Sequence, residues 1–197
     1  ADLPVLGAEV TGLHFGSYSL VVPPVADATA ALVAAHARGF ISIDPNIRPT
    51  VEPDMAIWRE RLDPLWASAD LVKISTEDLD LIHPGRTPAD FAADLIARGV
   101  GLVVVTDGGG PAQGWGAGGV RAEASPPLVE VVDTVGAGDT FQATLLAGLM
   151  SRTGDPKAGL AGLDASGLQA MLARAARAAA ITCSRRGADL PRSADLA

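Results

Sequence analysis

Short apolar runs alternate with segments of helical periodicity through the first half of the chain. Four of the apolar runs predict strands, at 13–15, 40–43, 71–74 and 102–106. The last of them is apolar throughout, as in a strand that is covered on both faces. Three longer segments predict helices, at 25–38, 55–67 and 88–99. This alternation predicts an α/β fold, a three-layer αβα sandwich with a mainly parallel sheet.

The pattern changes after the glycine-rich stretch at 108–110. Two shorter runs, at 120–124 and 129–132, predict a hairpin or an edge pair of strands. Helices are predicted at 136–150 and 168–183. The segment 153–167 between them is rich in Gly, Asp and Ala and is predicted to be the most flexible part. No repeat or linker interrupts the chain, so residues 1–197 are expected to lie in one domain.

Composition narrows the class of protein. Of the 197 residues, 48% are hydrophobic and 19% are charged, which is typical of a globular protein with a core. The net charge is −8 and no basic patch stands out, so no nucleic-acid partner is expected. No apolar stretch is long enough to predict a membrane span, and the first residues lack a signal-peptide pattern, so a cytoplasmic location is expected.

The nine residues DTVGAGDTF, at 133–141, carry the strongest chemical signal. Gly136, Ala137 and Gly138 stand where an apolar run gives way to a predicted helix. Small residues at a helix start leave backbone N–H groups open to an anion, and the helix dipole adds partial positive charge there. Asp139 then has two interpretations. It either complements the helix N-terminus or accepts a proton from a hydroxyl that attacks a phosphate.

The string D-T-x-G-A-G-D-x-F closely resembles the C-terminal signature of the PfkB, or ribokinase-like, carbohydrate kinases. The resemblance implies a ribokinase-like fold and ATP-dependent phosphorylation of a sugar hydroxyl. It also implies that Asp139 is the catalytic base, in contact with the substrate, and that Gly136, Ala137 and Gly138 form the anion hole for the transferred phosphoryl group. Mg²⁺ is expected as well, because a triphosphate donor needs its charge neutralised.

Two further segments bear on the nucleotide. The TDGGG turn leaves bare backbone for a nucleotide, although three glycines can also form a simple turn. The resemblance assigns ATP contacts to Thr106, Gly108 and Gly110. Near the end, the string Arg-Gly-Ala resembles the loop that closes over the adenine and includes Gly187. In some members this loop helps to hold K⁺ together with the equivalent of Asp133; otherwise Asp133 is a turn residue and Gly187 a helix C-cap.

The string D-P-N-I-R at 44–48 follows a predicted strand, at the edge of the sheet where ligands bind in parallel sheets. Together with Trp58, it is similar to fructokinases and 2-keto-3-deoxygluconate kinases of the family. The similarity implies that Asn46 and Arg48 contact the sugar, because a guanidinium group suits phosphate and polar oxygens. A loop with a surface arginine is the alternative.

After the next predicted strand the family often has Asn-x-x-Glu, whose Glu helps to hold Mg²⁺ through water. This chain has Ser75 in place of the Asn, as fructokinase-like members do, and Glu77 is the expected water-mediated contact to Mg²⁺. The alternative for Glu77 is an acid that complements the first turn of a helix.

The family pattern extends well before the first residue of this sequence. We therefore expect the larger C-terminal part of a ribokinase-like kinase domain, without the N-terminal sugar-binding and lid portion. The expected function is that of a fructokinase-like kinase, homodimeric at full length, and kinases for 2-keto-3-deoxygluconate or ribose are alternatives. A nucleotide-binding module without catalysis is another. A dinucleotide-binding oxidoreductase is not favoured, because no G-x-G-x-x-G follows an early strand.

Overall fold

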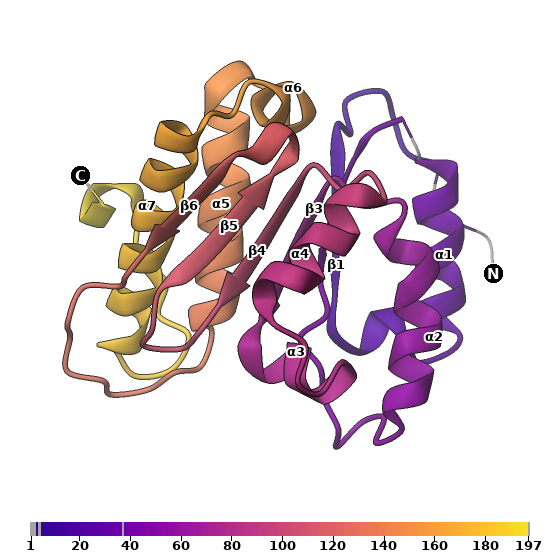
Figure 1. Ribbon diagram of the computed structural model, residues 1–197, viewed down its shortest axis with the longest axis horizontal. Coiled ribbons are helices and arrows are strands. Elements are labelled where there is room, and N and C mark those ends of the chain that lie inside the picture. The colour runs from indigo at the N-terminus through magenta and orange to yellow at the C-terminus, as the bar shows by residue number, and fades with distance from the viewer. Residues whose placement is uncertain (1–2, 4, 37, 197) are drawn as a thin grey trace. The chain divides into compact units, whose positions relative to one another are not determined.

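The computed structural model describes residues 3, 5–36 and 38–196, and the chain divides into two compact units (Figure 1). The first unit runs to Val105 and includes Trp115–Gly118. The second unit comprises Thr106–Gly114 and the described residues from Gly119 onward. Strand β5 (Ala112–Gly116) therefore contributes residues to both units. Each unit is described by itself.

The first unit contains a parallel arrangement of strands, as the sequence pattern predicts. Its strands are β1 (Gly12–Gly16), β2 (Phe40–Asp44), β3 (Leu71–Ser75) and β4 (Leu102–Thr106), whose last residue belongs to the second unit. They are hydrogen-bonded in that order, and β5 follows β4. The pairs β1–β2 and β2–β3 are parallel. All four strands lie within two residues of their predicted bounds.

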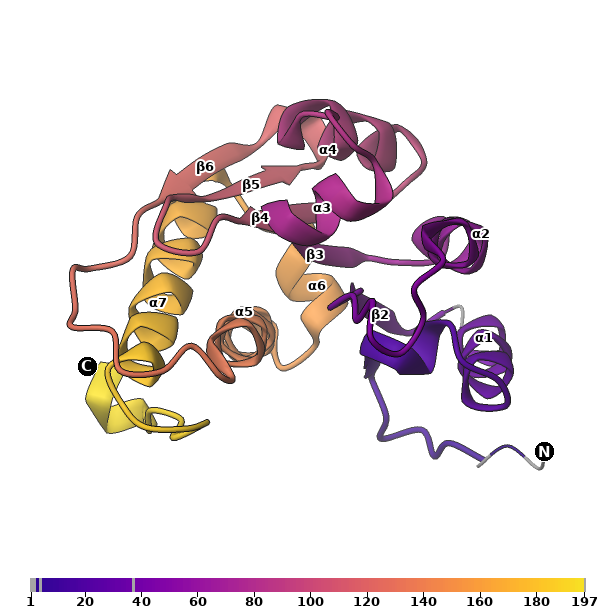
Figure 2. The ribbon, with the colours of Figure 1, turned by 90° about the horizontal axis from the view of Figure 1, so that it is seen from below.

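Four helices lie along one face of these strands (Figure 2): α1 (Val25–Ala35), α2 (Met55–Trp66), α3 (Thr76–Ile82) and α4 (Pro88–Ala97). The prediction at 25–38 reaches residue 37, which lies outside the described residues. Side-chain caps start three of the helices, from Asp54, Ser75 and Thr87. Helix α3 was not predicted, because its seven residues are too few to show a helical period.

Alternate strand residues and the inner faces of the helices form the core of the first unit. Ile41 and Ile43 of β2 belong to the same buried cluster as Val72 and Ile74 of β3. The helices contribute the fully buried Trp58 and the aromatic pair Trp66 and Phe91, whose ring centroids are 6.1 Å apart in an edge-to-face arrangement. This core holds the strands in place, and the candidate site residues of this unit come directly after the strands in the sequence.

The second unit combines the first part of β5 and its neighbour β6 (Arg121–Ala124) with three helices: α5 (Ala137–Thr153), α6 (Pro156–Ala161) and α7 (Ala165–Cys183). Figures 1 and 2 show that α5 and α7 lie side by side and that α7 runs along β6. The predicted strand at 120–124 and the helices at 136–150 and 168–183 are confirmed with small shifts of their bounds.

Three parts of the second half differ from the prediction. Residues 129–132 form an extended loop and no strand; Pro126 and Pro127 precede them and cannot donate to a strand ladder. Strand β5 was missed, because its sequence AQGWG has two glycines and little β propensity. The segment 153–167, predicted to be flexible, contains helix α6, which Asp155 caps by accepting from two backbone N–H groups. Among the described residues, no helix has the length and apolar character to cross a membrane.

Candidate active site

The turn before α5 is tied to the end of α7 by backbone and carboxylate hydrogen bonds. The Asp133 carboxylate accepts from the backbone N–H groups of Val135 at 3.0 Å and Gly187 at 2.9 Å. These two bonds, the Val135 bond first, lower the pKa of Asp133. The backbone N–H groups of Val132 and Asp133 both donate to the carbonyl of Cys183. Asp133 therefore links the turn before α5 to the segment that follows α7.

Gly136 sits at the N-cap of α5 in the left-handed region, with φ of 80°. A Cβ atom at this position would lie 2.9 Å from the Cβ of Ala188, closer than real Cβ contacts allow. Both the backbone conformation and the close approach of the 187–188 segment therefore require glycine here.

The predicted anion cradle lies at the start of α5, where two of the first three backbone N–H groups have no acceptor within the helix or its turn. The N–H of Ala137 already donates to the carbonyl of Thr134 at 3.2 Å. The N–H groups of Gly138 and Asp139 lie in the first turn, where helix geometry supplies no acceptor. The helix dipole adds partial positive charge at the same place. The open donors of the cradle are therefore those of Gly138 and Asp139.

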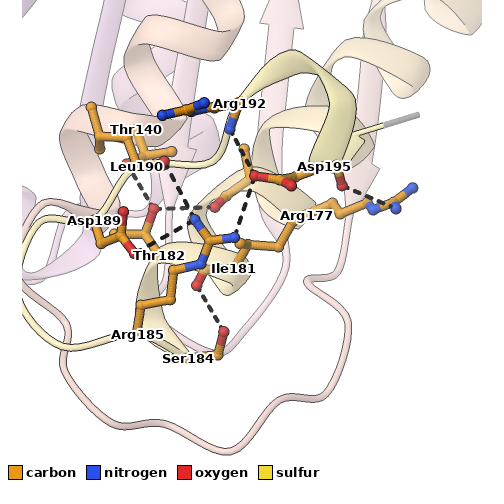
Figure 3. Close-up of polar contacts among 11 residues, drawn as sticks. Thr140, Arg177, Ile181, Thr182, Ser184, Arg185, Asp189, Leu190, Arg192 and Asp195 are labelled. Atoms are coloured by element: carbon orange, nitrogen blue, oxygen red, sulfur yellow. Dashed lines mark hydrogen bonds and ion pairs between the residues drawn. The ribbon is translucent and has the colours of Figure 1, made fainter.

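The side chains at the cradle divide into one exposed acid and one buried hydroxyl pair. Asp139 is exposed, so its carboxylate is accessible. The Thr140 hydroxyl is buried, donates to the carbonyl of Gly136 at 2.8 Å and lies 3.0 Å from the hydroxyl of Thr182 in α7. The Thr182 hydroxyl also lies within hydrogen-bond distance of a backbone carbonyl, that of Ala178 at 3.3 Å, so either hydroxyl can be the donor between the two (Figure 3). This pair anchors the cradle to α7.

A cavity of about 330 Å³ opens beside the cradle, and every residue that lines it belongs to the second unit. It brings the predicted nucleotide residues Thr106, Gly108 and Gly110 together with Ala137 and Gly138 of the cradle. Gly108 has a φ of 50°, and the N–H of Gly110 donates to the carbonyl of Asp107, so the glycine stretch is a tight turn. Gly187 does not line the cavity and contacts the turn through Asp133.

A network of ion pairs folds the last residues of the chain back onto α7 (Figure 3). The guanidinium group of Arg185 contacts Asp189 at 3.8 Å and Asp195 at 3.3 Å, and it donates to the carbonyl of Leu190. The Asp195 carboxylate also accepts from the N–H of Arg192, and this bond, with Arg185, lowers its pKa. This network was not predicted from the sequence. Its residues lie before and after the segment 187–188, which packs against Gly136.

Asn46 and Arg48 lie in the first unit, on the loop after β2. At the start of that loop, the Asp44 carboxylate forms a buried ion pair with the ammonium group of Lys73 at 2.8 Å. Asn46 has a positive φ of 42°, and the exposed Arg48 donates to the carbonyl of Ile47 at 3.0 Å. The two residues predicted to contact the sugar, Asn46 and Arg48, therefore lie on a loop whose first residue is fixed by a buried ion pair.

Glu77 and its neighbour Asp78 differ in where their carboxylates lie. Glu77 is exposed, whereas Asp78 is half-buried and accepts from the N–H of Ile47 at 3.1 Å. Burial raises the pKa of Asp78, and hydrogen bonds from Ser75 and Ile47 oppose the rise. Asp78 is not among the predicted site residues, although Asn-x-x-Glu counted from Ser75 ends at residue 78. No group of three or more His, Cys, Asp or Glu side chains forms a metal cluster among the described residues.

The fold and the site define a class of protein: an α/β protein with an apolar pocket that leads to an anion cradle and an exposed carboxylate. Residues 8–195 match the family model of the pfkB family carbohydrate kinases. A fructokinase of Rhizobium leguminosarum bv. trifolii is 39% identical over 170 residues, which cover 86% of this chain and 52% of that one. The chain belongs to the pfkB family, and it spans about half the length of the curated relatives it matches.

Solved structures confirm the predicted ribokinase-like fold. A fructokinase from Xylella fastidiosa with bound ATP superposes with a TM-score of 0.84 at 25% identity, covering 94% of this chain and 60% of that one. A putative ribokinase II from E. coli, in complex with ATP and Mg²⁺, gives a TM-score of 0.76 at 27% identity over 94% of this chain and 57% of its own.

Proposed function

We propose that the protein transfers the γ-phosphoryl group of ATP to a hydroxyl of a small sugar, with fructose as the favoured acceptor. The observation that carries the proposal is the exposed Asp139 carboxylate beside the open N–H groups of Gly138 and Asp139, at a cavity lined by a glycine turn. Membership of a carbohydrate kinase family and the similarity to fructokinases support the sugar as acceptor.

In the proposed reaction, the base of ATP occupies the cavity and its phosphates reach the cradle. The sugar hydroxyl oxygen bonds to the γ-phosphorus, the bond from that phosphorus to the bridging oxygen of ADP breaks, and the hydroxyl proton passes to the Asp139 carboxylate. The N–H groups of Gly138 and Asp139 stabilise the charge on the transferred oxygens. Asn46 and Arg48 are proposed to orient the acceptor.

Mg²⁺ would neutralise the donor phosphates, and it is usually held by one or two carboxylates and waters. The residues present fit such a contact: Glu77 is the predicted one, and Asp78 is a second carboxylate beside it. A K⁺ contact of Asp133 fits the free lone pairs of a carboxylate that already accepts two bonds. The homodimer and the cytoplasmic location remain predictions.

Asp139→Asn tests the proposed base, because Asn keeps the size of the side chain and cannot take the proton. We expect turnover, measured as sugar-dependent ADP release, to fall by about 10²–10⁴-fold or more while ATP binding by calorimetry persists. The matched control is Asp164→Asn, which changes the exposed cap of α7 and should affect stability only. Unchanged turnover in Asp139→Asn would mean that Asp139 only complements the helix.

A second candidate is a nucleotide-binding module without catalysis, and the observation that favours it is that the whole cavity lies in the second unit. Calorimetry with ATP and a panel of acceptors, including fructose, ribose and 2-keto-3-deoxygluconate, separates the two. Binding of ATP with no ADP release from any acceptor supports the module. Acceptor-dependent ADP release rejects it.

A further inference from the structure

We propose that the donor site discriminates only weakly between purine bases, so that GTP and ITP serve as phosphoryl donors alongside ATP. The inference rests on the proposed function, because it assigns the cavity to the donor nucleotide. The cavity itself indicates weak discrimination through the chemistry of the groups that line it.

The lining residues fall into two sets with different chemistry. One set is the glycine turn at 108–110 together with Ala137 and Gly138, where bare backbone N–H groups suit phosphates. The other set is apolar: it comprises Phe141, one face of α7 and five residues of the loop before α5, which are Pro126, Pro127, Leu128, Val129 and Val131. The purine ring belongs with the second set, because ligand rings are held mainly by apolar surface.

The face of α7 that lines the cavity carries no side chain able to read a base. Ala176, Ala179, Ala180 and Cys183 follow the spacing i, i+3, i+4 and i+7 and therefore share one face of the helix. Burial, with the charge of Asp133, raises the pKa of the Cys183 thiol, so it stays a neutral and weak hydrogen-bonding group. The N–H groups of the three alanines lie inside α7 and bond within it.

The opposite wall offers few hydrogen-bonding groups as well. Pro126 and Pro127 have no N–H, and Leu128, Val129 and Val131 have exposed apolar side chains. The remaining side chains with polar groups that line the cavity are Thr106, Asp107 and Thr134, which stand on the glycine turn and the cradle turn, the phosphate-binding parts. Base reading would therefore depend on backbone groups of an exposed loop.

Weak discrimination follows from how sites reject wrong ligands. A site built to hydrogen-bond a ligand rejects an analogue by about 10⁴–10⁵-fold, because its own buried polar groups are left unpaired, whereas apolar contacts discriminate by about 10–200-fold. The apolar set here has no side-chain donor or acceptor to leave unpaired apart from the weak thiol of Cys183. Relative to adenine, guanine and hypoxanthine should therefore lose only the binding free energy that it costs to place their polar edges against apolar surface.

The experiment compares donors in the unmodified chain. With fructose and Mg²⁺, we expect kcat/KM for GTP and ITP to lie within about 100-fold of the value for ATP. Calorimetry with ADP, GDP and IDP gives the same comparison without turnover. An ADP-to-GDP affinity ratio above about 100-fold, or no binding of any of them, overturns the inference. If the nucleotides bind with a small ratio but no donor supports turnover, the proposed function fails and the inference on the base stands.

A variant pair on α7 tests whether the base occupies this cavity. Ala179 lines it and is half-buried, whereas Ala173 lies on the exposed face of the same helix. Ala179→Trp should weaken ADP and GDP binding by the same factor, at least about tenfold, and Ala173→Trp should change neither. Loss of one nucleotide alone, or unchanged binding in a folded Ala179→Trp protein, contradicts the inference. The wild-type comparison of nucleotides decides it if that variant does not fold.

Discussion

The turn before α5 and the loop after β2 both carry residues of the proposed site, and they are held in place by different interactions. The turn at 133–139 depends on hydrogen bonds and close packing, through the Asp133 carboxylate, the Thr140 and Thr182 hydroxyls and the contact of Gly136 with the 187–188 segment. The loop at 44–48 depends on buried charge, through the Asp44–Lys73 ion pair and the carboxylate of Asp78.

The two parts of the proposed site should therefore tolerate different kinds of substitution. An ion pair shielded from water becomes costly when one partner is removed, because the other charge is left without compensation. A neutral hydroxyl pair costs far less to remove. The loop at 44–48 should therefore fail through single charge losses, and the turn at 133–139 through small steric changes.

The largest effect is expected from Lys73→Met, which leaves the buried Asp44 carboxylate without its cation. We expect the free energy of unfolding, measured with urea, to fall by about 3–5 kcal/mol. The control is Lys157→Met at the other lysine of the chain, which is exposed on α6 and should change stability by less than about 0.5 kcal/mol. Equal effects of the two substitutions would show that the buried pair is not what holds the loop.

The next effect is expected from Gly136→Ala, because it adds a methyl group where the backbone is left-handed and Ala188 is close. Gly154→Ala is the matched control: its φ is also 80°, and nothing lies within 4 Å of the added Cβ. Both should lose about 1–2 kcal/mol for the backbone conformation. Gly136→Ala should lose a further ~1–3 kcal/mol for overpacking and should weaken ATP binding. An equal loss in both variants would contradict the packing argument.

The same contrast explains what could be predicted from the sequence. The turn before α5 is a continuous string, so Asp139 and the small residues of the cradle could be identified, and the apolar runs located the parallel strands. The Asp44–Lys73 pair joins two strands that are 29 residues apart, and nothing local in the sequence pairs them. The Arg185–Asp195 contact and the role of Asp78 also depend on the fold, so they were missed.

Errors in the secondary structure have a related cause. Residues 129–132 have strong β propensity, yet no strand forms, because Pro126 and Pro127 precede them and cannot donate to a strand ladder. Strand β5 forms despite its glycines, because its neighbours β4 and β6 supply the ladder. In both cases the formation of a strand depends on whether a neighbouring strand is available for pairing. The local sequence pattern does not show which strands are neighbours.

A smaller effect is expected from Thr140→Val, which keeps the shape of the side chain and removes the hydroxyl that donates to Gly136. The matched control is Thr144→Val, one turn later, whose hydroxyl donates only to the carbonyl of Thr140. Thr140→Val should be less stable than Thr144→Val by about 1 kcal/mol, because the hydrogen bond to Gly136 is lost at a buried site. Thr140→Ser should restore most of the loss. If urea unfolding places the two valine variants together, the hydroxyl pair does not anchor the cradle.

The smallest effect should be a difference in the sign of pH dependence between the two loops. The pKa of Asp133 is lowered by backbone hydrogen bonds, so its contribution to stability is present above the unfolded value of about 3.9 and is lost as pH falls through its folded value. The pKa of Asp78 is raised by burial, so its contribution is largest below about 3.9 and is lost as pH rises through its folded value.

Asparagine variants convert these opposite signs into a measurement. Between about pH 3 and pH 7, the urea midpoint of Asp133→Asn should decrease relative to that of the wild type as pH rises. The reason is that only the ionised carboxylate is stabilised by the two N–H donors. Over the same range, the urea midpoint of Asp78→Asn should increase relative to that of the wild type. The variant avoids the cost of ionising a half-buried group, and its side-chain oxygen can still accept from the N–H of Ile47. If the difference in urea midpoint from the wild type has the same dependence on pH for both variants, the two carboxylates do not contribute to stability with opposite signs.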